Sequence, residues 1–204
     1  MFALVDKSDN SITKTLSGSQ GITLDGIQHP KAIFTLWSEA ERNAINIYTI
    51  EMDTSKRKDE EWYINTNVTY SFDGSKVTGS YGDATARAHA DTLFTAQDES
   101  DGKGTEGDVK DEGLKTKLIR SIKSQAEGEL NKTDWYITRK AEKDTAIPSA
   151  VSTHRDAVRS KQAEMETAIT NASDTPALET LYTYTTQEDG STTRPLGELP
   201  TKDF

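Results

Sequence analysis

An acidic, glycine-rich segment at residues 98–108 contains the residue types that come closest to a metal site. Carboxylates at short spacing around a glycine are typical of an EF-hand calcium loop, which needs glycine at its sixth position. With Gly102 at that position, the first ligand position falls on Gln97 and the last on Asp108. Gln97 lacks the charge that the first position needs, so we expect a solvated, mobile linker and no bound metal.

Residues that could catalyse a reaction are scattered along the chain. The three histidines, His29, His89 and His154, show no metal-binding spacing, and the chain has no cysteine and no G-x-S-x-G motif. The segment 18–21 lacks the Lys-Ser/Thr pair of a phosphate-binding loop. Carboxylates stand in charge runs, where no apolar surroundings would shift their pKa. We therefore expect a protein that is not an enzyme, with no catalytic residue and no cofactor.

The aromatic residues are better suited to binding by contact, because tryptophan and tyrosine lead the energetics of protein interfaces. Trp37, Trp62 and Trp135 each lie in an apolar or β-patterned stretch, so core packing is expected for all three. Neighbouring strand residues point to opposite faces. One of Trp62 and Tyr63 is therefore expected to face outward or into a subunit contact. The Trp135-Tyr136 pair is interpreted as a buried corner between two amphipathic helices.

The composition limits the possible partners. The 204 residues include 24 basic and 34 acidic side chains, a net charge of −10, and only 33% are hydrophobic. This charge repels phosphate backbones, so we expect no nucleic-acid partner. No apolar run approaches the roughly 20 residues of a membrane span, and residues 1–7 do not resemble a signal peptide, so no membrane partner is expected either.

The first 82 residues are predicted to form an antiparallel β meander with one short helix. Alternating apolar residues mark the strands, and Asp73-Gly74 is a strong hairpin turn. Ser38 followed by Glu41 predicts a capped helix that ends near Asn46. The stretches that are predicted as strands or hairpin partners are 2–5, 11–16, 47–52, 62–65, 68–72 and 76–81.

The rest of the chain is predicted to be helical, which makes the whole an α+β protein. Residues 83–113 read as an Ala-rich segment that could be helical, followed by the acidic linker. Residues 114–186 are predicted to form a helical hairpin domain, with a third short helix at 176–182. The tail 187–204, with its Gly and Pro residues, is predicted to be an extended C-terminal arm.

Two apolar patterns support the hairpin. Leucine, isoleucine and alanine recur every four residues from Leu114 to Leu130, which gives one apolar stripe. Pro148 is placed at the start of the second helix, where its missing N–H is tolerated. The heptad seam of that helix runs from Val151 to residue 172 and is weak at Arg155 and Gln162, which favours a hairpin over a long coiled coil.

The corner and the second helix also carry a motif. A Thr-Asp-Trp triplet is followed by a proline and then by a helix with Arg-x-x-hydrophobic-Arg, at Thr133, Asp134, Trp135, Pro148, Arg155, Val158 and Arg159. This half resembles a recurring segment in tail-associated proteins of tailed bacteriophages, although His154 stands where that family has tyrosine. The β-rich half, with 21–24, His29-Pro30 and 37–39, looks like the front part of such proteins, in a polar style similar to that of marine phages.

The resemblance implies a virion structural protein, a tail- or fibre-associated adaptor or connector. It implies that such a protein is assembled in the host bacterial cytoplasm, forms a homo-oligomer in the particle and binds other tail or fibre subunits. An alternative is a chaperone for tail-fibre assembly, and a second is a glycan-binding host-recognition module that uses Trp62 or Tyr63. The candidate interface residues are Trp62, Tyr63, Arg155, Arg159, Arg194 and Phe204.

Overall fold

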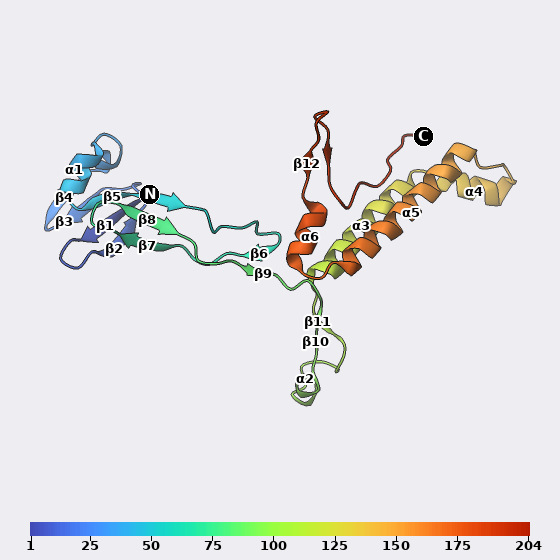
Figure 1. The fold of residues 1–204 in the computed structure, drawn as a ribbon, viewed down its shortest axis with the longest axis horizontal. Helices are drawn as coiled ribbons and strands as arrows, with labels where there is room; N and C mark the ends of the chain where they lie inside the picture. The colour runs from blue at the N-terminus through green and yellow to red at the C-terminus, as the bar shows by residue number, and fades with distance from the viewer. The chain divides into compact units, whose positions relative to one another are not determined.

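The chain folds as two units in the computed structural model, which describes residues 1–204. The first unit, Met1–Thr85, is rich in antiparallel strands, and the second, Ala86–Phe204, is mainly helical (Figure 1). The predicted α+β class, with a β-rich N-terminal region followed by a helical hairpin and an arm, is confirmed. A short strand, β9 (Thr85–Ala86), lies at the boundary between the units.

A five-stranded sheet of order β2-β1-β5-β8-β7 forms the first unit. The predicted hairpins β1–β2 and β7–β8 are both present and antiparallel. β5 and β8 instead run parallel, so the sheet is not a simple meander. After the long connection that follows β5, the chain first forms β7 at the edge of the sheet. β8 then returns antiparallel to β7 and lies between β7 and β5, so it runs parallel to β5. The strands are β1 (Phe2–Asp6), β2 (Ser11–Leu16), β5 (Ile47–Asp53), β7 (Thr69–Phe72) and β8 (Val77–Ser80).

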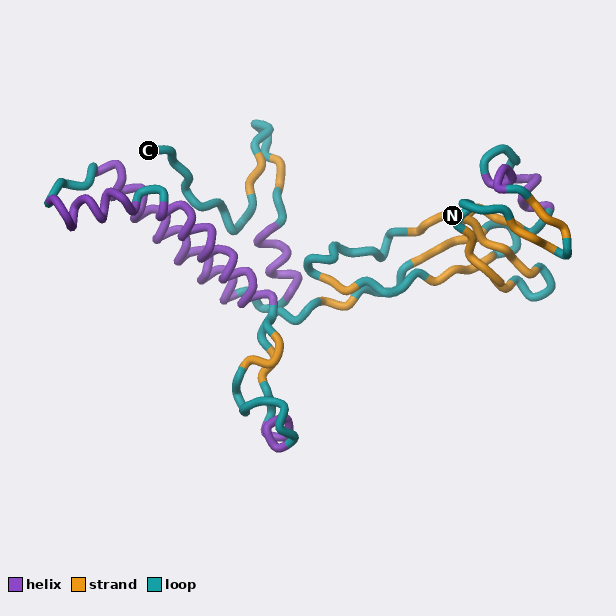
Figure 2. Tube along the Cα trace, turned by 180° about the vertical axis from the view of Figure 1, so that it is seen from behind, coloured by secondary structure: helices purple, strands orange, loops and turns teal.

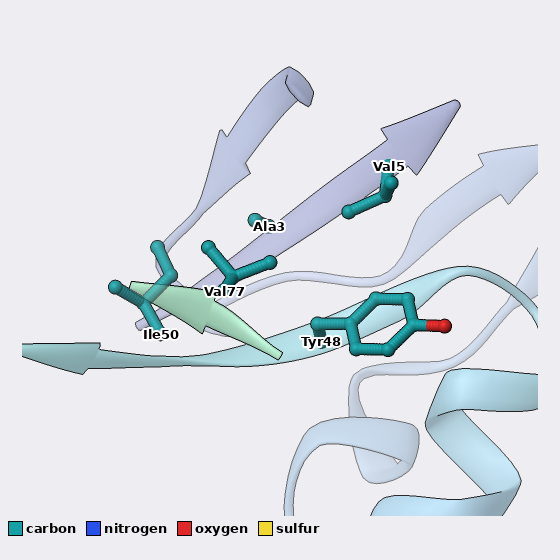
Figure 3. Close-up of a cluster of buried hydrophobic side chains, with 5 residues drawn as sticks. All are labelled: Ala3, Val5, Tyr48, Ile50 and Val77. Carbon is teal, nitrogen blue, oxygen red and sulfur yellow. The ribbon is translucent and has the colours of Figure 1, made fainter. Parts of the chain in front are cut away.

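Strand alternation divides the apolar residues of this sheet between two cores. Ala3 and Val5 of β1 point to one face, where they pack with Tyr48, Ile50 and Val77 (Figure 3). Phe2 and Leu4 point to the other face, which they share with three buried residues, Ile33, Phe34 and Ile47. Alternate residues of β1 therefore pack into two different apolar clusters, one on each face of the strand.

Short elements cover the second of these cores. The predicted capping box is present: the Glu41 N–H donates to Ser38 Oγ at 3.3 Å, and the Ser38 N–H donates to the Glu41 carboxylate at 2.7 Å. The helix that it starts ends at Ala44, close to the predicted end. The elements here are β3 (Ile22–Leu24), β4 (Ile27–His29), the 3-10 helix η1 (Lys31–Phe34) and α1 (Glu39–Ala44).

The second unit begins with a small ordered lobe, residues 91–113, which we call the finger. It comprises β10 (Thr92–Leu93), α2 (Ala96–Ser100) and β11 (Val109–Asp111), with β10 and β11 antiparallel. The predictions of a helix at 84–94 and of a mobile linker at 98–108 are both wrong. Local bonds offset the ordering entropy: Thr95 and Asp98 form a capping box, and Phe94 packs against Gly104.

The predicted helical hairpin follows the finger. α3 (Leu114–Asn131) and α5 (Ser149–Asn171) lie side by side and antiparallel, and the Lys115 ammonium donates to the Thr170 carbonyl at 2.8 Å (Figure 2). Pro148 caps the start of α5, as predicted. α4 (Asp134–Lys143) comes between α3 and α5 in the sequence and lies at the far end of the hairpin (Figure 1). α6 (Thr175–Tyr182) is the predicted third short helix. The buried residues of α3 and α5 include Ile122, Ala126, Val151, Val158, Met165 and Ile169.

The C-terminal arm begins with a feature that was not predicted, a short hairpin of β12 (Thr185–Thr186) and β13 (Thr192–Thr193). The remaining residues are irregular and return to the helices. Leu196 is buried, and its N–H donates to the Leu181 carbonyl at 3.0 Å. The Phe204 ring lies 5.2 Å from the His154 ring of α5. None of the helices is both long enough and apolar enough to cross a membrane.

Candidate interaction surface

The corner between α3 and α4 is held by Arg155, which projects from α5. Its guanidinium Nη1 donates to the Leu130 carbonyl at 2.7 Å, to the Thr133 hydroxyl at 2.7 Å and to the Asp134 carboxylate at 2.8 Å. Thr133 and Arg155 are both buried, and the Thr133 hydroxyl donates to the Leu130 carbonyl. The seam position that appeared weak in the sequence is therefore a buried polar anchor, because its charge is matched by acceptors at the end of α3.

The predicted burial of Trp135 is wrong. α4 has no buried residue, and the Trp135 side chain is 51% exposed. The reason lies in its neighbour: Asp134 faces Arg155, and the next residue of a helix points about 100° away from it. The bond that anchors the start of α4 therefore turns the Trp135 ring toward solvent.

Three side chains form a cluster on α4. The Trp135 and Tyr136 rings lie 3.7 Å apart between centroids, and the Arg139 guanidinium lies 4.7 Å from the first and 5.3 Å from the second. Spacings of three and four residues place these side chains on one face, and Lys140 and Lys143 continue the same stripe. We call Trp135, Tyr136, Arg139 and these two lysines the α4 surface.

This surface is suited to binding another macromolecule by contact. Tryptophan, tyrosine and arginine are the residue types most enriched at interface hot spots. The stacked rings and the cation above them are already ordered, so binding would immobilise few rotamers. The cations of Arg139, Lys140 and Lys143 add positive charge beside the two rings. The arrangement supports recognition of an acidic partner that also carries apolar side chains.

Trp62 and Tyr63 do not form a second contact surface. Both are only 4% exposed, so the prediction that one of them faces outward is wrong. The N–H groups of both residues donate to the Asp59 carbonyl in a turn, and β6 (Tyr63–Ile64) is only two residues long. Strand alternation therefore does not extend back to Trp62. The exposed apolar side chain here is Ile64.

The other three candidate residues lie apart from the α4 surface. Arg159 is exposed on α5, 3.5 Å from Asp156. Arg194 stacks on Tyr182 and Tyr184 and donates to the Gly197 carbonyl at 3.1 Å, so it anchors the start of the irregular arm. Phe204 is half-exposed at the end of that arm. The structure gives Arg155 and Arg194 internal roles and leaves Arg159 and Phe204 accessible.

None of the five members of the α4 surface is among the interface residues predicted from the sequence. The signal was present in the sequence: residues 134–143 contain no apolar stripe that would need burial, yet aromatic and basic residues repeat at helical spacing. A helix with such a pattern has little to bury against its own chain. The polar residues around Trp135 in the sequence favour its exposure over burial in a core.

The surface also has shallow, open hollows. One of them is a groove of about 700 Å³ along α5, lined by Leu130, Arg159, Gln162, Ala163, Glu166, Thr167, Thr170 and Asn171. No three histidine, aspartate or glutamate side chains lie close enough together to hold a metal ion. His154 is buried beside the partly exposed Glu129, and their Nε2 and Oε2 atoms are 4.0 Å apart.

The chain was compared with known proteins at three levels. No protein-family model, no curated protein and no solved structure matches it.

Proposed function

We propose that the chain is a non-enzymatic structural protein of a tailed-phage particle, a tail- or fibre-associated adaptor that binds neighbouring subunits. The observation that carries the proposal is the α4 surface, where an ordered Trp-Tyr-Arg cluster is exposed on a helix with no buried residue. Such a surface is typical of a contact site.

The bonds at the corner between α3 and α4 explain why several residues of the phage-like motif occur together. Thr133, Asp134 and Arg155 bond to one another, and their arrangement leaves Trp135 exposed. Four of the motif residues therefore serve one purpose, the presentation of an aromatic ring at the end of a helical hairpin. This is the arrangement that a connector between subunits would need, and it supports the adaptor reading over that of an isolated domain.

The proposal places the protein in the tail of the particle, after assembly in the host bacterial cytoplasm. Its partners would be other tail or fibre subunits and further copies of itself. A glycan-binding role through Trp62 or Tyr63 loses its support, since neither ring is exposed. The net charge of −10 continues to disfavour nucleic acid as a partner.

Co-sedimentation of the purified chain with tails or fibres from the particle that encodes it tests the proposal. The wild-type protein is expected to co-sediment, and Trp135→Ala is expected to remain in the supernatant. Ile137→Ala is the matched control, because Ile137 is exposed on the same helix outside the α4 surface. Equal co-sedimentation of all three proteins would contradict a role for this surface.

Mass spectrometry of purified particles separates the adaptor from the assembly chaperone. An adaptor remains in the mature particle and is detected there. A chaperone is required for fibre folding but is absent from the finished virion. Absence from particles, together with binding to free fibres through Trp135, would replace the adaptor with the chaperone.

A further inference from the structure

The second unit carries another exposed apolar patch besides the α4 surface, on the finger. Leu93 of β10 and Val109 of β11 lie directly opposite each other in register, and each is 48% exposed. Their sequence neighbours Phe94 and Lys110 lie close together, with the Lys110 ammonium 5.8 Å from the Phe94 ring, and Phe94 packs on Gly104 within the finger. Because successive strand residues alternate between faces, Leu93 and Val109 form an uncovered face on the other side.

The finger is strongly acidic. Residues 98–112 contain seven carboxylates and two lysines. Both lysines bond within the finger: Lys103 lies 2.9 Å from Asp101, and Lys110 lies 3.2 Å from Asp98. Glu112 is paired with Arg120 of α3, and no other basic residue of the finger compensates the remaining carboxylates, so the finger that carries the Leu93–Val109 face has an excess of negative charge.

The α4 surface has the complementary character. It offers the Trp135 and Tyr136 rings for apolar contact and the cations of Arg139, Lys140 and Lys143 for carboxylates. Lys140 is already paired with Asp144 at the end of the helix. The apolar Leu93–Val109 pair on the acidic finger is thus complementary to the stacked rings and cations of the α4 surface.

The finger of one copy is held far from the α4 surface of the same copy. Asp91 fixes the base of the finger to the start of α3, by accepting from the Gly113 N–H at 2.7 Å and from the Thr116 hydroxyl at 2.8 Å. α4 begins beyond the other end of α3, whose 18 residues span about 27 Å. Figures 1 and 2 both show the two elements at opposite ends of this helix.

We propose that the Leu93–Val109 face of one copy docks on the α4 surface of a second copy. Such a contact joins two different patches, so it is heterologous and leaves one free patch at each end of a dimer. Repetition builds a ring or a row of subunits. This inference rests on the proposed function, since it names one of the neighbouring subunits that the adaptor would bind.

Sedimentation velocity of the full chain over a range of concentrations tests the contact. The wild-type protein is expected to form dimers and larger species as its concentration rises. Trp135→Ala, Arg139→Glu and the double variant Leu93→Ser with Val109→Ser are each expected to weaken association by about thirtyfold, the loss typical of a hot spot. Ile137→Ala is expected to associate like the wild type.

Mixing the two kinds of variant gives the sharper result. The Trp135→Ala protein retains an intact finger, and the Leu93→Ser, Val109→Ser protein retains an intact α4 surface. Their equimolar mixture is expected to form a dimer that does not extend further, at concentrations where the weakened association leaves each variant alone monomeric. A wild-type protein that stays monomeric, a finger variant that associates normally, or a mixture that forms no dimer would each overturn the inference.

The two proposals fail separately. A monomeric chain that still co-sediments with tails through Trp135 keeps the adaptor role and removes the contact between copies. A chain that associates through these two faces but neither binds tails nor occurs in particles keeps the contact and removes the adaptor role.

Discussion

Two Trp-Tyr pairs occur in this chain, and they differ in solvent exposure. Trp62 and Tyr63 are almost fully buried in the first unit, whereas the Trp135 ring of α4 is 51% exposed beside Tyr136. The sequence instead predicted one outward-facing ring in the first pair and a buried corner at the second. Identical residue types therefore do not decide burial. The surrounding backbone and the bonds of the adjacent residues decide it.

The backbone around each pair explains the difference. A turn closed on the Asp59 carbonyl precedes β6 and replaces the expected strand alternation at Trp62. At the second pair, Asp134 is bound by Arg155 of α5, which fixes the rotation of α4. A buried polar anchor thus directs the neighbouring ring outward. The comparison suggests that the first pair contributes to stability and the second to association.

Truncation of Trp62 is expected to give the largest effect on stability. Trp62→Ala should lower the free energy of unfolding by about 3–5 kcal/mol, since it removes a buried ring and leaves a cavity. Urea denaturation followed by circular dichroism measures the change. Trp62→Phe, which retains much of the volume, should lose considerably less. A Trp62→Ala protein as stable as the wild type would contradict the burial of this pair.

Removal of the Arg155 side chain is expected to have the next largest effect. Arg155→Ala should cost about 2–3 kcal/mol, because buried acceptors at Leu130 and Thr133 lose their donor, while Asp134 is half-exposed and can be hydrated. Denaturation of the second unit provides the measurement. Hydrogen exchange of the α4 amides should also increase. Unchanged exchange in α4 would show that Arg155 does not set the orientation of this helix.

Acid is expected to open the finger locally. The Thr95 N–H, the Thr95 hydroxyl and Lys110 lower the pKa of Asp98 from 3.8 to about 2. A carboxylate with a lowered pKa stabilises the folded state above its unfolded value, and that contribution is lost as the pH falls from about 4 to 2. Hydrogen exchange of the Thr95 and Asp98 amides, corrected for intrinsic rates, should accelerate over this range. Asp98→Asn should make the exchange insensitive to pH there.

The smallest effect on stability is expected at the second Trp-Tyr pair. Trp135→Ala should change the free energy of unfolding by no more than about 0.5 kcal/mol, as is usual for exposed positions. Denaturation beside the Trp62→Ala protein gives a direct comparison on the same scale. A loss comparable to that of Trp62→Ala would mean that the Trp135 ring is covered by its own chain.

Elements that depend on nearby residues were predictable from the sequence. The capping box at Ser38 and Glu41, the Asp73-Gly74 hairpin and the apolar stripe that begins at Leu114 all formed as expected. In each case the signal and the structure lie within a few residues of one another. Local propensity and hydrophobic period therefore predicted the longer helices and strands, whereas most of the two- and three-residue strands and the helices α2 and α4 were not predicted.

Features that depend on distant or polar bonds were not predictable in the same way. The finger is ordered by a capping box and by packing of Phe94 on Gly104, which a composition rich in glycine and acid does not reveal. The exposure of Trp135 depends on a bond between Asp134 and Arg155, which lie 21 residues apart in the sequence. Arg155 interrupts the apolar seam in the sequence, and the acceptors to which it donates are known only from the structure.

Hydroxyl-radical footprinting of the free and the assembled protein tests the central claim most directly, that the α4 surface is a contact site. Oxidation of each tryptophan is quantified by mass spectrometry. Trp135 is expected to oxidise rapidly in the dilute chain and to become protected on assembly, while Trp62 stays protected in both states. Slow oxidation of Trp135 in the dilute chain, or equal oxidation in both states, would contradict the account.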